Sequence, residues 1–165
     1  MRWPWHLAIL YQQTPKELLN HLYLKPGAFP EEVNFPTGSL GAVLMCRVAH
    51  FFSPEQLVSG LNKISNWLIP GGKLFFVSIT PTHRLLNDEF MPIYKQRLEM
   101  GEKWPGIINN MKELNPLEAE NFPDFFNVFD EYVIKNLLPE FGFSIQEMQL
   151  FDNNGYLGFV AEKNC

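Results

Sequence analysis

The residues best suited to chemistry follow one short apolar run, Gly41 to Cys46, which reads GAVLMC. Such a run is typical of a strand buried on both faces of a parallel sheet. Open α/β sheets bind ligands at the carboxyl ends of their strands. We therefore expect a ligand site at the end of this run, formed by Cys46, Arg47, Val48, His50 and Phe51.

Two of these side chains have functional groups that suit a ligand. The planar guanidinium of Arg47 could hold a carboxylate, and His50 could act as a base or a hydrogen-bond donor. The alternative is that each is an ordinary capping or surface group. Cys46 is expected in the core, because no base stands near it in the sequence. No catalytic residue is assigned, and the four histidines are too scattered to predict a metal site.

A strand, a helix and a second strand are expected to position this site. Ser53 and Gln56 form a capping box around Pro54, which suits the first helical position. Apolar residues recur on one face of the helix, at Leu57, Leu61, Ile64 and Leu68. Pro70-Gly71-Gly72 ends the helix, and Lys73 to Thr80 is the next apolar strand. This βαβ crossover requires two parallel strands.

The segment before this crossover is expected to be short helices and loop. Pro4 to Gln13 is predicted to be helical, and Thr14 is predicted to cap a second helix over Pro15 to His21. Leu22 to Leu24 is a candidate strand. The chain that follows, through Gly38, is punctuated by proline and glycine and is expected to be loop.

After the crossover, the sequence predicts a helix from Leu86 to Arg97 and another from Asp130 to Pro139. A strand then ends near Phe151, and Asp152-Asn153-Asn154-Gly155 is a hairpin turn. The last strand, Tyr156 to Glu162, is therefore expected to run antiparallel to its predecessor, at the edge of an otherwise parallel sheet.

This order of elements resembles the class I, Rossmann-like S-adenosylmethionine-dependent methyltransferases. Ala42 to Leu74 is similar to a strand of that family, the capped helix after it, and the proline, two glycines and strand that follow. Phe141-Gly142-Phe143 and Gly158 to Lys163 look like its reversed final hairpin. The resemblance implies an α/β fold with a partial methyltransferase sheet, mainly parallel, with a C-terminal antiparallel hairpin and helices packed on the sheet.

The resemblance also implies S-adenosylmethionine as cofactor. Its binding residues would include the predicted ligand site at the end of the apolar run, Cys46, Arg47, Val48, His50 and Phe51. Gly27, Ala28 and Phe29 match the loop after the family's third strand and would line the adenine pocket; their alternative interpretation is a turn glycine and a loop anchor. Ala28 replaces the family's usual acidic residue, and its methyl group accepts no hydrogen bond. The family's Gly-rich turn and ribose-binding carboxylate have no counterpart, so we expect an N-terminally truncated member. Met1 to Trp5 would then begin a shortened gene or a cloned fragment.

Residues 82 to 127 occupy the place where the family builds its substrate lid. Aromatic residues that could enclose a small acceptor, or else form ordinary core, are Phe90, Tyr94, Trp104, Phe122, Phe125 and Phe126. Two functions follow from the resemblance. The chain transfers a methyl group to a small-molecule acceptor, or it is a non-catalytic remnant or interaction protein that has lost the cofactor site.

Composition limits the partners and the compartment. The 165 residues, 46% of them hydrophobic, suit one domain, 1–165. A net charge of −5 does not favour nucleic acid, and no apolar stretch suits a membrane span. Two cysteines make no disulfide framework, which fits the cytoplasm. A sheet without the family's first two strands would expose the edge of the Gly41 to Cys46 strand. The Leu22 to Leu24 strand or the N-terminal helices could cover this edge, and the expectation we favour is a homodimer paired there.

Overall fold

The computed structural model describes residues 5–86, 88–118 and 120–165, and the contacts divide the chain into two compact units, residues 1–34 and 35–165. The predicted single domain stays a prediction. The predicted start of the chain at Met1 to Trp5 lies outside the described residues except for Trp5, the first residue of helix α1 (Trp5–Gln13).

The first unit also contains the 3₁₀ helix η1 (Lys16–His21), where a capped α-helix is predicted. Thr14 does not cap it, because its hydroxyl donates a hydrogen bond back to the Leu10 carbonyl at 2.7 Å. The predicted strand from Leu22 to Leu24 is also wrong. No strand of the described chain pairs with it, and the Tyr23 side chain is 81% exposed.

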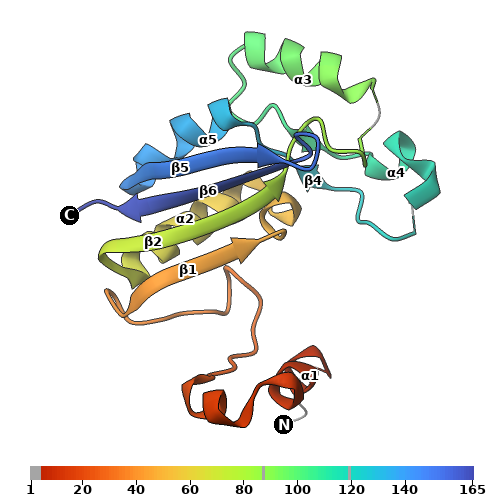
Figure 1. Ribbon diagram of the computed structural model, residues 1–165. Helices are drawn as coiled ribbons and strands as arrows, with labels where there is room; N and C mark the ends of the chain where they lie inside the picture. Colours follow the sequence, from red (N-terminus) through yellow and green to blue (C-terminus); the bar gives the residue numbers. More distant parts are fainter. Residues whose placement is uncertain (1–4, 87, 119) are drawn as a thin grey trace. The chain divides into compact units, whose positions relative to one another are not determined.

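The second unit is built on a four-stranded sheet in the order β1-β2-β6-β5 (Figure 1). The strands are β1 (Leu40–Cys46), β2 (Leu68–Ile79), β5 (Phe143–Phe151) and β6 (Tyr156–Lys163). β1 and β2 are parallel, and β6 is antiparallel to both β2 and β5, so three of the four strands run in the same direction. The predicted fold class is confirmed: α/β, mainly parallel, with a C-terminal antiparallel hairpin.

The position predicted for the last strand is wrong. β6 lies between β2 and β5, and β5 forms the edge. β5 therefore lies two positions from β2, and the chain reverses after β5 so that β6 pairs with both strands. Asp152, Asn153 and Asn154 make this turn in the left-handed region, with φ of 52°, 53° and 64°, which asparagine and aspartate tolerate better than most residues.

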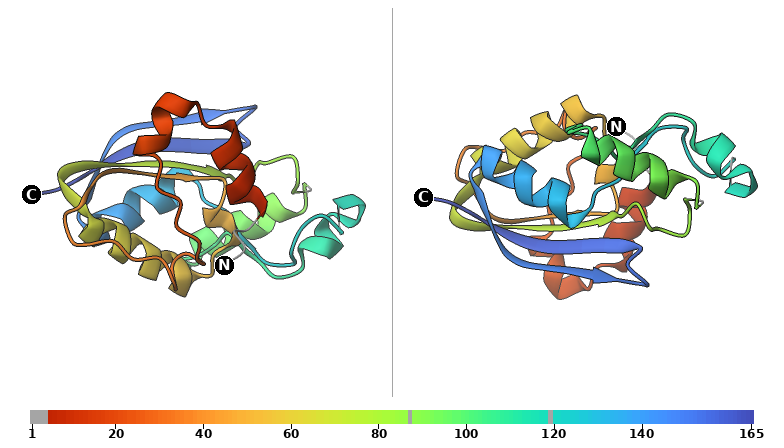
Figure 2. Two further views of the ribbon diagram at one scale, coloured as in Figure 1. Left: turned by 90° about the horizontal axis from the view of Figure 1, so that it is seen from below. Right: turned by 90° about the horizontal axis from the view of Figure 1, so that it is seen from above.

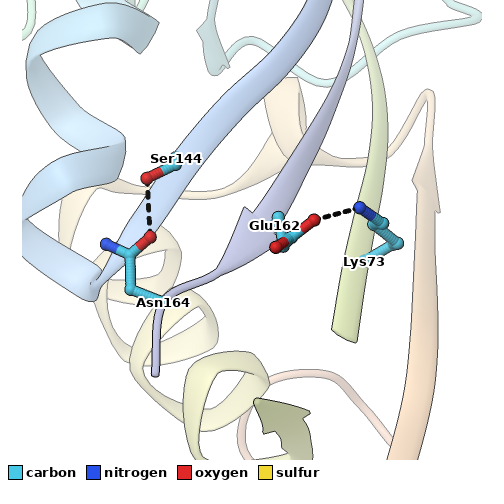
Figure 3. A network of polar contacts seen from close by, with 4 residues as sticks. All are labelled: Lys73, Ser144, Glu162 and Asn164. Carbon is cyan, nitrogen blue, oxygen red and sulfur yellow. Dashed lines mark hydrogen bonds and ion pairs between the residues drawn. The ribbon is translucent and has the colours of Figure 1, made fainter. Parts of the chain in front are cut away.

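Polar contacts hold the strands at the end of the sheet where β2 begins and β6 finishes (Figure 3). Lys73 on β2 forms an ion pair with Glu162, its register partner on β6. Beside it, the Ser144 hydroxyl of β5 donates a hydrogen bond to Asn164 Oδ1 at 2.6 Å. These contacts join β2 to β6, and β5 to the residue after β6, at this end of the sheet.

Two helices cover one face of the sheet (Figure 2). Helix α2 (Pro54–Trp67) begins with the predicted capping box, since Ser53 Oγ accepts from the Gln56 amide and Gln56 Oε1 accepts from the Ser53 amide. Its predicted apolar face is buried. The helix ends at Trp67, earlier than predicted, and Pro70-Gly71-Gly72 lies within β2. Helix α5 (Glu131–Leu137), capped by Asp130, continues as the 3₁₀ helix η4 (Leu138–Phe141).

β1 is not buried on both faces as predicted. Met45 is its one buried residue, and Leu44 is 70% exposed, because β1 is the edge strand and pairs only with β2 within residues 35–165. For the same reason Cys46, predicted in the core, is exposed. Both Cys46 and Cys165 are free thiols.

The predicted insertion, residues 82 to 127, folds into short elements. They are α3 (Phe90–Glu99), β3 (Ile107–Ile108), α4 (Met111–Leu114), the 3₁₀ helix η3 (Pro116–Glu118) and β4 (Phe126–Asn127), which pairs with β3. Phe90, Tyr94 and Phe126 are buried together in a hydrophobic cluster with Ile79 at the end of β2. These three aromatics are therefore core residues. The lid role of the insertion stays a prediction.

Among the residues described, no helix is both long and apolar enough to cross a membrane. The same residues hold no cluster of three or more His, Cys, Asp or Glu side chains that could bind a metal ion.

Candidate functional site

A pocket of about 350 Å³ opens where β1 and β2 end. Its position follows from the parallel pairing of these strands, which brings the loops after Cys46 and Ile79 to the same edge of the sheet. β6 contributes its first residue, which pairs with Ile79. The lining residues are Arg47, His50, Phe51, Ile79, His83, Arg84, Leu85, Phe122 and Tyr156.

Arg47 stands at the point where the chain leaves β1. Its backbone has φ of 55°, an uncommon conformation for a side chain of this size, and its amide donates to the Val77 carbonyl at 2.8 Å. The guanidinium carbon lies 4.3 Å from the centre of the Tyr156 ring, a cation–π contact. The strained turn thus places a positive charge on the aromatic wall of the pocket.

His50 is a buried, neutral side chain in the 3₁₀ helix η2 (Ala49–Phe51). Its ring stacks on Phe126, with ring centres 5.5 Å apart, and its Nδ1 lies 3.4 Å from Ser78 Oγ. Burial lowers the pKa of His50 to about 4, helped by the nearby His83 and Arg47. At neutral pH the imidazole is therefore uncharged.

His83 follows β2 as His50 follows β1. Its Nδ1 accepts a hydrogen bond from the Leu85 amide at 3.2 Å, so the neutral ring carries its proton on Nε2. That Nε2 is buried and has no hydrogen-bond partner within the described chain. Burial lowers the pKa of His83, and Arg84 and Arg47 lower it further while Asp152 opposes them.

Contacts with the β5–β6 turn hold the His83 loop in place. Thr80 Oγ1 and Thr82 Oγ1 both donate to the Asn154 carbonyl, at 2.6 and 2.7 Å. A Cβ atom on Gly155 would lie 3.3 Å from the His83 ring, so the turn passes close to it. The ring of His83 packs edge to face on Tyr156, with centres 4.7 Å apart.

The structure brings together part of the predicted site. Arg47, His50 and Phe51 line the pocket, whereas Cys46 and Val48 are exposed and are not among its lining residues. The other three predicted residues belong to the unit 1–34. There Gly27 has φ of 150°, the Ala28 amide donates to Glu32 Oε2 at 2.8 Å, and Phe29 precedes a cis proline.

Sequence reasoning missed His83, Arg84 and Tyr156. One signal could have found His83: it stands four positions after the end of β2, as His50 stands four positions after the end of β1. In adjacent parallel strands, equal offsets from the strand ends place two side chains at the same edge. No such signal marks Tyr156, because its position depends on the pairing of β6 with β2 and not on a local pattern.

These elements define the fold of the class I S-adenosylmethionine-dependent methyltransferases. Over 96% of its length the chain is similar to a SAM-dependent methyltransferase from Methanosarcina mazei, at 16% identity and a TM-score of 0.63, and it spans 76% of that protein. No protein-family model and no curated protein matches the sequence.

Two further solved structures share the fold. One is the 1,6-didemethyltoxoflavin-N1-methyltransferase of Burkholderia thailandensis, with 1,6-didemethyltoxoflavin and S-adenosylhomocysteine bound. The identity is 15% and the TM-score is 0.51, and the match covers 79% of this chain and 47% of that protein. The other is the cyclase SpnF, at 11% identity and a TM-score of 0.58. That match covers 95% of this chain and 60% of the cyclase. Likeness at these identities establishes the fold and leaves the reaction open.

The described residues do not fit a complete S-adenosylmethionine site. In the unit 35–165, no strand lies beyond β1, where the family's glycine-rich turn would belong. The pocket lining contains two arginines and no carboxylate among the described residues. A sulfonium cation would be repelled by these arginines at close range.

Proposed function

We propose that this chain supplies the acceptor side of a S-adenosylmethionine-dependent methyltransferase and binds a small-molecule acceptor. The observation that carries the proposal is the pocket between Arg47, His50 and His83, at the carboxyl ends of two parallel strands. Its volume of about 350 Å³ falls within the range of small-molecule sites. The methyltransferase fold supports this interpretation.

The contribution of the chain's own residues is to hold and orient the acceptor. Phe51, Leu85 and Phe122 offer apolar and aromatic surface to its body, and Arg47 and His83 offer hydrogen-bond donors to its polar groups. The neutral imidazole of His50 can accept a hydrogen bond from an acceptor hydroxyl or amine, and its low pKa makes it a weak base. Positioning of this kind is the main protein contribution to a direct group transfer.

The second candidate is a non-catalytic protein that binds a small molecule in the same pocket. The observation that favours it is that, in the unit 35–165, no strand lies beyond β1, where the family's glycine-rich turn would belong. Both candidates predict ligand binding, and they differ in whether methyl transfer occurs.

The genomic DNA upstream of the Met1 codon separates the two candidates. For the methyltransferase we expect an in-frame strand with a glycine-rich turn, and the extended protein should transfer label from methyl-labelled S-adenosylmethionine to small molecules of a cell extract. Arg47→Gln should reduce this transfer. A stop codon directly upstream, together with no label transfer by the chain, would exclude the methyltransferase and leave the binding protein.

A further inference from the structure

The pocket contains a fixed positive charge that forms no ion pair with a carboxylate of the described residues. The Arg47 guanidinium rests on Tyr156, and no ion pair joins it to a carboxylate of the described chain. His50 and His83 are uncharged at neutral pH, since burial lowers both pKa values. The charge at this wall therefore comes from Arg47, with Arg84 beside it in the lining.

A buried hydrogen-bond donor lies next to that charge. His83 is 3% exposed, and its protonated Nε2 has no acceptor in the described chain. Buried polar groups are nearly always paired in native proteins, so an orphan donor in a pocket wall indicates a missing partner. Arg47 and His83 both pack on the ring of Tyr156, at 4.3 and 4.7 Å from its centre, and both line the pocket.

The rest of the lining is apolar and aromatic. Phe51, Ile79, Leu85 and Phe122 face the same space. A ligand that suits this lining has an anionic end with acceptor oxygens and a flat, apolar body. We infer that the acceptor is an aromatic carboxylate, with its carboxylate bound by Arg47 and His83. The inference rests on the proposed function, because it names the acceptor class of that pocket.

Benzoate and benzamide test the inference directly, because they have the same shape and differ in charge. In isothermal titration calorimetry of the purified chain, benzoate should bind at least about tenfold more tightly than benzamide. Arg47→Gln should abolish this preference, and Arg47→Lys should restore part of it, since lysine keeps the charge and loses the planar fork. Lys95→Gln, an exposed charge on α3, is the matched control and should change nothing.

A thermal melt of each variant confirms that it is folded. Equal affinity for the two compounds, an unchanged preference in Arg47→Gln, or no benzoate binding in the millimolar range would overturn the inference. The proposed function fails separately. If the chain binds benzoate but its extended form transfers no methyl group, the anion site is retained and the methyltransferase is rejected. If the extended form methylates only neutral acceptors, the methyltransferase is retained and the anion site is rejected.

Discussion

At the scale of single residues, two histidines dominate the candidate site because the fold keeps both uncharged. His50 is buried against Phe126, and His83 is buried against Tyr156. Within residues 5–86, 88–118 and 120–165, neither histidine has a hydrogen bond to a carboxylate that would favour the imidazolium. Their burial links the integrity of the pocket to pH.

The first prediction concerns this pH dependence. The pKa of His50 is 6.5 when the chain is unfolded and about 4 in the fold, so between these values the unfolded state binds the extra proton. The free energy of unfolding should fall as the pH falls through this window and level off below it. At about 1.4 kcal/mol per pKa unit, the contribution is on the order of 3 kcal/mol.

Urea titrations at about pH 7 and about pH 4 measure this contribution in wild type and His50→Gln. The variant should lose less stability on acidification than wild type, by roughly 2 to 3 kcal/mol. His21→Gln, an exposed histidine, should behave like wild type. Parallel losses in wild type and His50→Gln would show that His50 is not held neutral by the fold.

The second prediction concerns Gly106, a residue of the insertion that packs against Val128 in the segment before α5. A Cβ atom there would lie 1.9 Å from the Val128 carbonyl oxygen, and the Val128 amide donates to the Gly106 carbonyl at 3.0 Å. Gly106→Ala must move buried backbone, so we expect a loss of about 1 to 3 kcal/mol or more in urea unfolding. Gly41→Ala, with no atom within 4 Å of its Cβ position, is the control. Equal stability of the two variants would contradict this packing.

At the scale of elements, what the sequence could predict was local. The capping box of α2 and the four-residue turn before β6 are decided by neighbouring residues, and both are present. The exposure of Leu44 and the place of β6 depend on which strands pair, which no local pattern specifies. His50 and His83 line one pocket for the same long-range reason, so His83, Arg84 and Tyr156 escaped prediction.

The third prediction tests the local signal at α2. Ser53→Ala removes the acceptor for the Gln56 amide, so it should cost about 1 kcal/mol of unfolding free energy in urea titrations. Ser59→Ala, at an exposed position within the same helix, should be neutral or slightly stabilising, because alanine is the better helix former. Equal losses of unfolding free energy in the two variants would show that the capping box does not stabilise the start of α2.

At the scale of the whole molecule, the free edge of β1 is the feature that needs a partner. Within residues 35–165 β1 pairs only with β2, and its exposed face includes Leu44 at 70%. Proteins rarely leave an apolar, uncharged edge open. We therefore propose that two copies of the chain pair through this edge.

The fourth prediction is that light scattering at tens of micromolar protein gives the mass of a dimer. Leu44→Lys should shift it towards the monomer, because a charge on an edge strand opposes pairing. Leu117→Lys, at a leucine that is 96% exposed in η3, should leave the dimer intact. A monomeric wild type would reject the pairing.

We propose that the described residues bind the acceptor and do not form a complete cofactor site. Calorimetric titration of the purified chain with S-adenosylmethionine tests it most directly. Loss of several polar contacts worth about 1 to 3 kcal/mol each weakens a micromolar site to millimolar or beyond, so we predict no binding tighter than millimolar. A dissociation constant in the low micromolar range would reject this proposal, because the described residues would then form a cofactor site without the family's glycine-rich turn and ribose-binding carboxylate.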